Sequence, residues 1–458
     1  MSLSLAKALR VEHSPVVAFI GAGGKTTAMF QLARQLGSPV IVTATSHLGA
    51  WQLQLADQHL VVDTPAPLEQ MQHAWKGVIL ITGRLDGDRT RPIHSSVLHW
   101  LHGFCDEHAI PLLIEADGSR GKPLKAWAMH EPALPTFVSL VVQVVGLSGL
   151  GKTLHTEHVH RPEIFSGLSG LNTEKKVTPD AIARVLTQPE GGMKNIPPAA
   201  RKVVLLNQAD TAELQSAARG LTQTLLPAYD SAIIASLRHA RIYAVYEPVA
   251  GIILAAGGST RFGQPKQLLN WKGQSFVRAV ARAALDAGLA PVVVVTGASA
   301  GKVQAALAGL PVEIIKNGDW MSGQASSIKA GISSLSPSTA DAGTLRSPVG
   351  RGRAQVGAAI FLLADQPQIT TAVLRALVEK HAEGLYPIVA PMVLDRRANP
   401  VLFDRATFKD LAALQGDVGG RAIFGNHRLE YLPWHDDRLL LDVDTPEMYQ
   451  RLISDETL

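Results

Sequence analysis

The sequence predicts an α/β protein with two domains, each a three-layer arrangement of a sheet between helices. Three observations support this prediction. Short runs rich in Val, Ile and Leu alternate with longer helical patterns through most of the chain. Two of these runs lead directly into glycine-rich loops. The length of 458 residues also exceeds what one hydrophobic core usually holds.

The apolar runs have the length of strands and too little polar alternation for an exposed face, so we expect parallel sheets covered on both sides. Helical patterns rich in Ala, Leu and Gln separate the runs. The predicted strands are 16–20, 39–45, 112–117, 138–145 and 202–207, followed by 251–257, 291–297, 312–317 and 359–365.

The boundary between the domains is predicted near YEPVAG, residues 246–251, because a new strand begins there and opens into a glycine-rich loop. This gives a first domain of residues 1–247 and a second of residues 248–458. The segment 333–357 is rich in Ser, Gly, Pro and Arg, and we expect a flexible surface insertion inside the second domain.

Composition limits the classes of function. Apolar residues make up 46% of the chain and charged residues 18%, which is typical of a globular protein. The formal net charge of +4 is too small to indicate nucleic acid binding, although it suits anionic small ligands. A single cysteine, Cys105, fits a reducing compartment. The N-terminus is a poor signal peptide and no apolar run reaches about 18 residues, so we expect a cytoplasmic protein without membrane contact.

Gly-Lys-Thr occurs twice in the first domain. The downstream copy, 146–153, matches the phosphate-loop pattern G-x-x-x-x-G-K-[ST]. The upstream copy in FIGAGGKTT, residues 19–27, fails the pattern because Phe19 replaces the first Gly. However, a phosphate loop needs a strand before it and a helix after it, since the helix N-terminus and the loop N–H groups bind the anion. The helical pattern that follows each copy must therefore decide between them.

The upstream copy is the predicted phosphate site, which makes the first domain one of the P-loop type. An apolar helical stripe follows Lys25 and ends at Gly37, whereas Pro162 closes a poor helical pattern after the downstream copy. Glu115 and Asp117 stand at a strand end, a common place for an acid that holds Mg²⁺. The predicted nucleotide-binding residues are Gly21, Gly23, Gly24, Lys25, Thr26 and Thr27, with Thr26 and Asp117 as metal ligands.

Two further patterns in this domain are left open. LLNQAD, residues 205–210, looks like the N-K-x-D strand end that reads a guanine base, which makes Asn207 and Asp210 candidate base readers, although Gln208 replaces the Lys. The histidines of 155–160 have a spacing compatible with metal ligands. With no cysteine nearby, ordinary surface or packing histidines are the favoured interpretation.

The first domain resembles the YqeC family, which is associated with selenium-dependent molybdenum hydroxylases. The matching segments are GAGGKTT (21–27), TATSHL (43–48), and the stretches 115–135 and 144–165. GAGGKTT is also similar to the G-T-N-G-K-T-T loop of Mur-type ligases. The resemblance implies a domain that binds a nucleotide, ATP or GTP, and that aids modification of a molybdenum cofactor or its delivery to a molybdenum hydroxylase apoenzyme.

The second domain opens with the most specific pattern in the chain. GIILAAGGSTRFGQPKQLLNWKG, residues 251–273, leads from a buried strand through small residues to Arg261 and Lys266. Small residues let the backbone close around a triphosphate, while the two cations neutralise oxygens that become more negative as pyrophosphate leaves. The ordered set L-A-A-G-x-x-x-R-x-G-x-P-K therefore predicts a nucleotidyl-transfer loop.

This pattern resembles the MobA/MocA-like nucleotidyltransferases, and within them the molybdenum cofactor cytidylyltransferases. Further segments agree along nearly all of 249–455, among them NGDWMSGQASSIKAGI (317–332), LLADQP (362–367) and LDVDTPEMY (441–449). The resemblance implies a Rossmann-like nucleotidyltransferase fold. Two departures are the 333–357 insertion and RRANP, 396–400, where relatives often carry Gly-His-Pro.

By this resemblance, Asp365 holds the catalytic Mg²⁺ and Asp442 or Asp444 completes the metal site, while Arg261 and Lys266 act with Asp365 in catalysis. The residues implied to approach the nucleotide are Leu254, Ala255, Ala256, Gly257, Gly258, Ser259, Asn317, Ser326 and Ser327.

The predicted activity is transfer of CMP from CTP to Mo-molybdopterin, with release of pyrophosphate. A magnesium ion on Asp365 would stabilise an in-line displacement, and a phosphate acceptor needs no general base because it is already ionised. Ala256, which gives L-A-A-G instead of L-A-G-G, favours CTP over GTP by resemblance. Two alternatives stay open: a nucleotidyltransferase for a sugar or polyol phosphate, and a non-catalytic cofactor-delivery chaperone.

Overall fold

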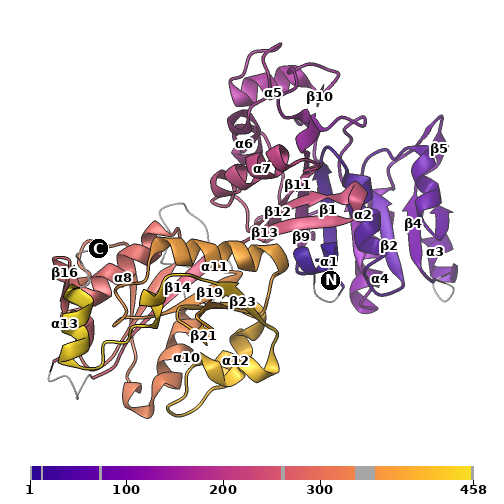
Figure 1. Ribbon diagram of the computed structural model, residues 1–458. Helices are drawn as coiled ribbons and strands as arrows, with labels where there is room; N and C mark the ends of the chain where they lie inside the picture. Colours follow the sequence, from indigo (N-terminus) through magenta and orange to yellow (C-terminus); the bar gives the residue numbers. More distant parts are fainter. Residues whose placement is uncertain (1–2, 12–13, 72–74, 259–263, 336–355, 455–458) are drawn as a thin grey trace. The chain divides into compact units, whose positions relative to one another are not determined.

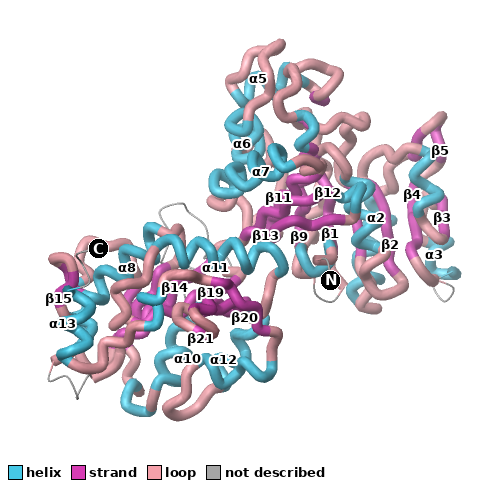
Figure 2. Tube along the Cα trace, viewed as in Figure 1, coloured by secondary structure: helices cyan, strands magenta, loops and turns pink. Residues whose placement is uncertain are grey.

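The protein divides into two compact α/β units, Met1–Tyr246 and Glu247–Leu458 (Figure 1). The structure is a computed structural model that describes residues 3–11, 14–71, 75–258, 264–335 and 356–454. Each unit contains one large sheet with helices packed on it, and Figure 2 shows the alternation of helices and strands along the chain. The mixed α/β class predicted from the apolar runs is confirmed.

The sheet of the first unit has the strand order β13-β12-β11-β9-β1-β7-β2-β4-β3. All neighbouring strands are parallel except β12 and β13, which are antiparallel. The strands are β1 (Val16–Gly21), β2 (Val40–Ala44), β3 (Gln58–Val61), β4 (Val78–Thr82), β7 (Leu112–Glu115), β9 (Leu140–Gly146), β11 (Arg201–Asn207), β12 (Ser231–Ser236) and β13 (Arg241–Tyr246). Short pairs lie outside it: β5 (Leu85–Asp86) with β6 (Arg89–Thr90), and β8 (Leu124–Lys125) with β10 (Val159–His160).

The helices of the first unit are α1 (Leu5–Ala8), α2 (Lys25–Ala33), α3 (Ala66–Met71), α4 (Ser95–Glu107), α5 (Pro162–Ser169), α6 (Pro179–Thr187) and α7 (Ala212–Leu225). Leu101 and Phe104 of α4 pack in one buried cluster with Ile20 of β1. The helix after Lys25 ends at Ala33 and not at Gly37 as predicted, because the Gln35 N–H bonds to the Leu32 carbonyl three residues back (2.9 Å) and tightens the last turn.

The sheet of the second unit has the order β18-β17-β14-β19-β22-β20-β21, with β23 also paired to β20. The strands are β14 (Val249–Ala255), β17 (Val292–Thr296), β18 (Glu313–Lys316), β19 (Ala358–Leu363), β20 (Ile388–Val393), β21 (Arg396–Arg397), β22 (Val401–Asp404) and β23 (Leu429–Pro433). Outside it, β15 (Asn270–Trp271) pairs with β16 (Gln274–Ser275).

The runs predicted from the sequence form parallel strands in the second unit, but later strands make its sheet a mixed one. β18, β17, β14 and β19 are parallel, but β22 runs antiparallel to both β19 and β20. The connection from β20 to β22 is too short for the crossover that parallel neighbours require, so the chain reverses. These later strands were not among the predicted apolar runs.

Helices cover both faces of the second sheet. They are α8 (Phe276–Asp286), α9 (Ala300–Ala306), α10 (Gln324–Leu335), α11 (Thr371–Gly384), α12 (Phe408–Ala413) and α13 (Pro446–Ser454). Along β14, Ile253 is buried with residues of α8 and α11, whereas Ile252 is buried with residues of α10 and α12. The predicted insertion 333–357 begins inside α10, which extends to Leu335, and its residues 336–355 lie outside the described residues.

The register of the first sheet places several predicted site residues at the carboxyl ends of its central strands. Glu115 pairs with Phe19, Gly21 with Val144, and Gly146 with Asn207. The loops after β1, β7, β9 and β11 therefore leave the sheet side by side. Among the described residues, no helix has both the length and the apolar character needed to cross a membrane.

Glycines allow the loop after β1 to pack against the end of β9. Gly23 has a φ of 83°, and a Cβ there would lie 2.4 Å from the Cα of Gly146 and 2.9 Å from the carbonyl oxygen of Pro123. Both neighbours are backbone and cannot rotate away. The first Gly of the downstream Gly-Lys-Thr segment therefore serves as a packing partner of the upstream loop.

Substitution Gly23→Ala should lower the free energy of unfolding of the first unit by about 2 kcal/mol or more, since it adds both backbone strain and a clash. Gly87→Ala is the matched control, because Gly87 also has a positive φ, 63°, but a Cβ there meets no atom within 4 Å. We expect a loss of only about 1 kcal/mol for the control. Urea unfolding measures both, and equal losses would contradict the packing argument.

Candidate functional site

The upstream Gly-Lys-Thr loop forms part of the wall of a cavity of about 790 Å³ in the first unit. Gly24, Lys25, Thr26 and Thr27 line it at the start of α2. The opposite walls come from the loops after β2, β7 and β8. Cationic side chains dominate the charged lining, with Lys25, Arg89, Arg120, Lys122 and Arg161 facing the acids Asp88, Glu115 and Glu131. A loop at a helix N-terminus together with these cations suits an anionic ligand.

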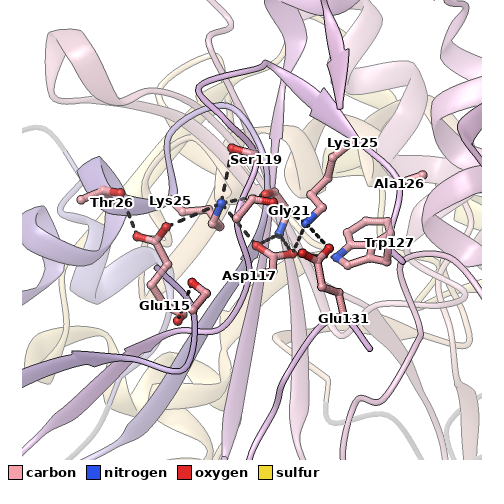
Figure 3. A network of polar contacts seen from close by, with 12 residues as sticks. Gly21, Lys25, Thr26, Glu115, Asp117, Ser119, Lys125, Ala126, Trp127 and Glu131 are labelled. Carbon is pink, nitrogen blue, oxygen red and sulfur yellow. Dashed lines mark hydrogen bonds and ion pairs between the residues drawn. The ribbon is translucent and has the colours of Figure 1, made fainter. Parts of the chain in front are cut away.

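Lys25 is held at the centre of a buried polar network (Figure 3). Its side chain is 4% exposed, and Nζ donates to the Gly21 carbonyl (2.9 Å) and lies 3.3 Å from Oδ1 of Asp117. Burial by itself lowers the pKa of Lys25, but the carboxylates of Asp117 and Glu115 outweigh it, so the pKa lies above the usual lysine value. Lys25 is therefore a permanent cation beside the cavity.

The acid that contacts Thr26 is Glu115, while the predicted metal ligand Asp117 has other partners. Thr26 Oγ1 donates to Glu115 Oε2 (2.8 Å). The buried carboxylate of Asp117 accepts from the N–H groups of Gly21 and Trp127 (2.9 and 2.7 Å to Oδ2) and lies 3.1 Å from Lys125 Nζ. Burial raises the pKa of Glu115, while the nearby Lys25 and the hydrogen bond from Thr26 oppose the increase.

A second cluster, Lys125, Glu131 and Arg161, extends this network. Glu131 accepts hydrogen bonds from Lys125 (3.0 Å) and from Arg161. Burial alone raises the pKa of Glu131, but Arg161 and Lys125 outweigh it and lower the pKa to about 2. Burial and the same two cations lower the pKa of His160 to about 4, so that histidine is neutral near pH 7. The sequence assigned no role to Lys125, Glu131 and Arg161, because only the fold brings β8 and β10 together.

In the described chain, no α-helix follows the downstream Gly-Lys-Thr segment directly. Residues Leu147–Gly149 form a single 3-10 turn, and the next α-helix in the described chain begins at Pro162. Lys152 and Thr153 are both exposed and do not line the cavity. The match to the phosphate-loop pattern therefore lacks the geometry that binds an anion.

Asn207, a candidate base reader, connects the loop to the next strand end. Its Nδ2 donates to the Gly23 carbonyl (2.7 Å) and its Oδ1 accepts from the Leu237 N–H (3.0 Å). Asp210 accepts a hydrogen bond from Ser236 Oγ and does not line the cavity. Base reading by these two residues stays a prediction, and both already have partners within the chain.

The nucleotidyl-transfer loop of the second unit lines a cavity of about 620 Å³ at the ends of β14 and β19. Predicted residues that line it are Leu254, Ala255, Ala256, Gly257, Ser327 and Asp365. Gly258 lies beside Trp320, whose ring would be 3.5 Å from a Cβ at that glycine. Ser259 and Arg261 lie outside the described residues. Four lining residues not named from the sequence are Gln267, Trp320, Gln324 and Asp417.

Asp365 and Lys266 belong to one charged group with the acids near the C-terminus. Lys266 Nζ bonds to Asp444 Oδ1 (2.6 Å), and Asp442 Oδ1 accepts from Gln366 (2.8 Å). Burial raises the pKa of Asp365, Lys266 opposes this, and the nearby Asp442 and Asp444 add to the increase. The fold thus brings together acids separated by more than seventy residues.

Asn317, Ser326 and Ser327 also meet. Asn317 Nδ2 donates to both hydroxyls, at 2.8 Å to Ser326 and 3.1 Å to Ser327, and its Oδ1 accepts from the Asp319 N–H (2.9 Å). Asn317 therefore fixes the start of α10, and only Ser327 of the three lines the cavity.

Neither cavity holds a complete metal site of protein ligands. No group of three His, Cys, Asp or Glu side chains in the described part of the chain is placed to bind a metal ion. Magnesium commonly takes one or two carboxylates and completes its shell with water and substrate phosphates. Asp365 in the second unit, and Thr26 with Glu115 in the first, have the oxygen chemistry for that mode of binding.

Two family models match the chain. The YqeC protein model matches residues 17–163, and the MobA-like NTP transferase domain model matches residues 251–432. Both resemblances noted from the motifs are thereby confirmed.

Three relatives agree with this division. The chain is 32% identical over 220 residues to uncharacterized protein YqeC of Escherichia coli, which covers 46% of this chain and 82% of that protein. It is 32% identical over 219 residues to nicotine blue oxidoreductase of Paenarthrobacter nicotinovorans, which covers 45% of this chain and 96% of that protein. A shorter match is to a probable molybdenum cofactor guanylyltransferase of Bacillus cytotoxicus. It is 41% identical over 64 residues and covers 14% of this chain and 32% of that protein.

Substitution Glu131→Gln should destabilise the first unit by about 3 kcal/mol near pH 7, because it removes the carboxylate that pairs with Arg161 and one of the two that pair with Lys125. The pKa of Glu131 is lowered from 4.5 to about 2, so its stabilising effect is complete above pH 4.5 and is lost as the pH falls toward 2. Urea unfolding at several pH values should show the difference between wild type and variant shrinking over this range.

Glu157→Gln is the control for this experiment. The Glu157 side chain is 75% exposed, and its carboxylate lies 3.9 Å from His158, which is long for an ion pair. We expect it to change the unfolding free energy by less than about 0.5 kcal/mol. A loss for Glu131→Gln that does not depend on pH would refute the ion-pair explanation.

Proposed function

Because this chain belongs to the YqeC family in its first unit and to the MobA-like NTP transferase family in its second, we propose that it is a two-part protein of molybdenum cofactor maturation. The second unit would transfer CMP from CTP to Mo-molybdopterin and release pyrophosphate. The first unit would bind ATP or GTP and aid modification of the cofactor or its delivery to a molybdenum hydroxylase apoenzyme.

The observation that carries the proposal for the second unit is the cavity that the L-A-A-G loop shares with Asp365. The backbone of Ala256 and Gly257 borders this space. Lys266, on the loop that follows, supplies a cation whose present partner is the exposed carboxylate of Asp444. Together these groups match what a nucleoside triphosphate needs: a close-fitting backbone, a cation and an acid.

In this proposal Lys266 would exchange Asp444 for phosphate oxygens when the triphosphate binds, and Arg261 would add a second cation. Asp365 would hold Mg²⁺, with Asp442 or Asp444 completing the protein ligands. The ion would supply charge stabilisation as the bond between the α-phosphorus and pyrophosphate breaks. An oxygen of the acceptor phosphate forms the new bond to that phosphorus as pyrophosphate leaves, so the reaction needs no water molecule.

The proposal that CTP is the nucleotide rests on Ala256. This residue is buried, and its carbonyl accepts from the Ala298 N–H (3.2 Å). In relatives with L-A-G-G the corresponding position is Gly, and these tend to use GTP. One relative is named as a probable guanylyltransferase, so GTP must be compared with CTP in the assay.

The proposal for the first unit rests on the cavity beside Lys25. The loop after β1 leads directly into α2, so its N–H groups and the helix N-terminus face a space with several cations. Thr26 and Glu115 would hold Mg²⁺ against the phosphates. Asp117, which accepts from the Gly21 N–H, would position the loop.

Substitution Asp365→Asn should lower the rate of pyrophosphate release by about a hundredfold or more, because the amide cannot hold Mg²⁺ or balance its charge. The rate is measured on purified protein with CTP, Mg²⁺ and Mo-molybdopterin. Asp395→Asn, at an exposed turn with a φ of 58°, is the matched control and should retain the wild-type rate. Equal rates for both variants would exclude Asp365 from the reaction.

The nucleotide and the acceptor are tested with the same assay. We expect CTP to support turnover at least about tenfold faster than GTP with Mo-molybdopterin as acceptor, and sugar or polyol phosphates to be inactive. Turnover only with a sugar or polyol phosphate would replace the proposed acceptor. If no acceptor supports turnover while targets still mature in cells carrying Asp365→Ala, the chaperone alternative holds.

Substitution Lys25→Ala should weaken binding of ATP or GTP to the first unit by about tenfold to a hundredfold, since a charged contact to phosphate is lost. Lys152→Ala is the control, because Lys152 belongs to the exposed downstream copy, and it should bind like the wild type. Calorimetric titration measures both, with thermal unfolding to show that each variant folds. The reverse pattern would move the site to the downstream copy.

A further inference from the structure

A second cavity of the first unit adjoins the one at the phosphate loop. It has a volume of about 600 Å³, and both cavities are lined by Thr26, Thr27 and Trp51. A ligand whose anionic part lies on the loop can therefore continue past the start of α2 into this second space. Most of its lining is apolar, including Leu5, Phe30, Leu55, Leu237 and Ile242.

The polar side chains of this second cavity already have partners in the protein. Gln31 Nε2 donates to the Leu237 carbonyl (2.7 Å), and Gln35 Oε1 accepts from the Ala6 N–H (2.9 Å). Arg34 donates to the Leu55 carbonyl (2.8 Å) and pairs with Asp57. Each of these three side chains is therefore held by at least one contact within the protein.

Trp51 is the prominent exception to the burial of apolar side chains at this site. Its side chain is 65% exposed, although it lies where the two cavities meet. Exposed tryptophan rings bind nucleobases by stacking, and stacking tolerates any base because every base has a flat π face. An aromatic surface next to a phosphate site thus suits a nucleoside.

Recognition of guanine by Asn207 and Asp210 would compete with hydrogen bonds that both residues already make. Both ends of the Asn207 amide are used within the chain, by Gly23 and Leu237. Asp210 lines neither cavity and accepts a hydrogen bond from Ser236. The hydrogen bonds that distinguish guanine from adenine would have to displace these contacts.

We propose that the second cavity takes the nucleobase of the triphosphate whose phosphates lie on the 21–27 loop, with Trp51 as the stacking surface and with little discrimination between adenine and guanine. This proposal rests on the phosphate site proposed above for the first unit. In this proposal the first unit binds the base by stacking on its face and not by hydrogen bonds to its edge.

The test is calorimetric titration of the full chain with ATP, GTP and inorganic triphosphate. Lys25→Ala is titrated alongside, and the binding that this substitution weakens is assigned to the first unit. We expect ATP and GTP to bind the wild type with affinities within about fivefold of each other. Trp51→Ala should weaken both by similar factors of about tenfold or more while leaving inorganic triphosphate unchanged, and Trp51→Phe should restore most of the affinity.

The outcomes separate this proposal from the one it rests on. If Trp51→Ala binds ATP like the wild type while Lys25→Ala weakens ATP binding, the phosphate site stands and the stacking proposal is overturned. An affinity ratio between ATP and GTP of about a hundredfold would also overturn it, because it requires edge reading. If inorganic triphosphate binds equally to the wild type and to Lys25→Ala, both proposals fail.

Discussion

The arrangement of the loop site in the first unit depends on the contacts of one buried carboxylate, that of Asp117. It accepts from the Gly21 N–H at the end of β1, from Trp127, and it lies within 3.3 Å of Lys25 and 3.1 Å of Lys125. Each of these groups belongs to a different segment, so one acid sets the position of the loop, its lysine and the neighbouring cation cluster. Two lysines and two N–H donors compensate the cost of burying its charge.

The two units have similar loops but differ in how their lysine is held. Both end a buried parallel strand in a loop of small residues and place an acid from a neighbouring strand beside a lysine. In the first unit the lysine is 4% exposed and lies near two buried carboxylates, Glu115 and Asp117. In the second, Lys266 pairs with an exposed acid, Asp444. The first lysine is thus held within the protein interior, whereas the second has an ion-pair partner that is open to solvent.

A pattern match and a site are different things in this chain. The downstream copy matches the phosphate-loop expression, but its Gly146 packs on Gly23 and its Lys152 is exposed. The upstream copy fails the expression, and a helix begins at its Lys25. Phosphate binding needs convergent N–H groups, which depend on the strand and helix around the loop and not on the letters of the motif.

The sequence by itself determined the α/β class, the parallel runs and both families, because apolar periodicity and local motifs are short-range properties. It also placed Asp365 at a strand end, Lys25 directly before a helix and Lys266 in a loop that follows a strand. Only the tertiary structure decided that Glu115 and not Asp117 contacts Thr26, that Glu131 joins Arg161, that Trp51 lies between two cavities, and that β22 reverses the second sheet. Those outcomes depend on which distant segments meet, and a local pattern does not encode the direction in which a side chain at a strand end will point.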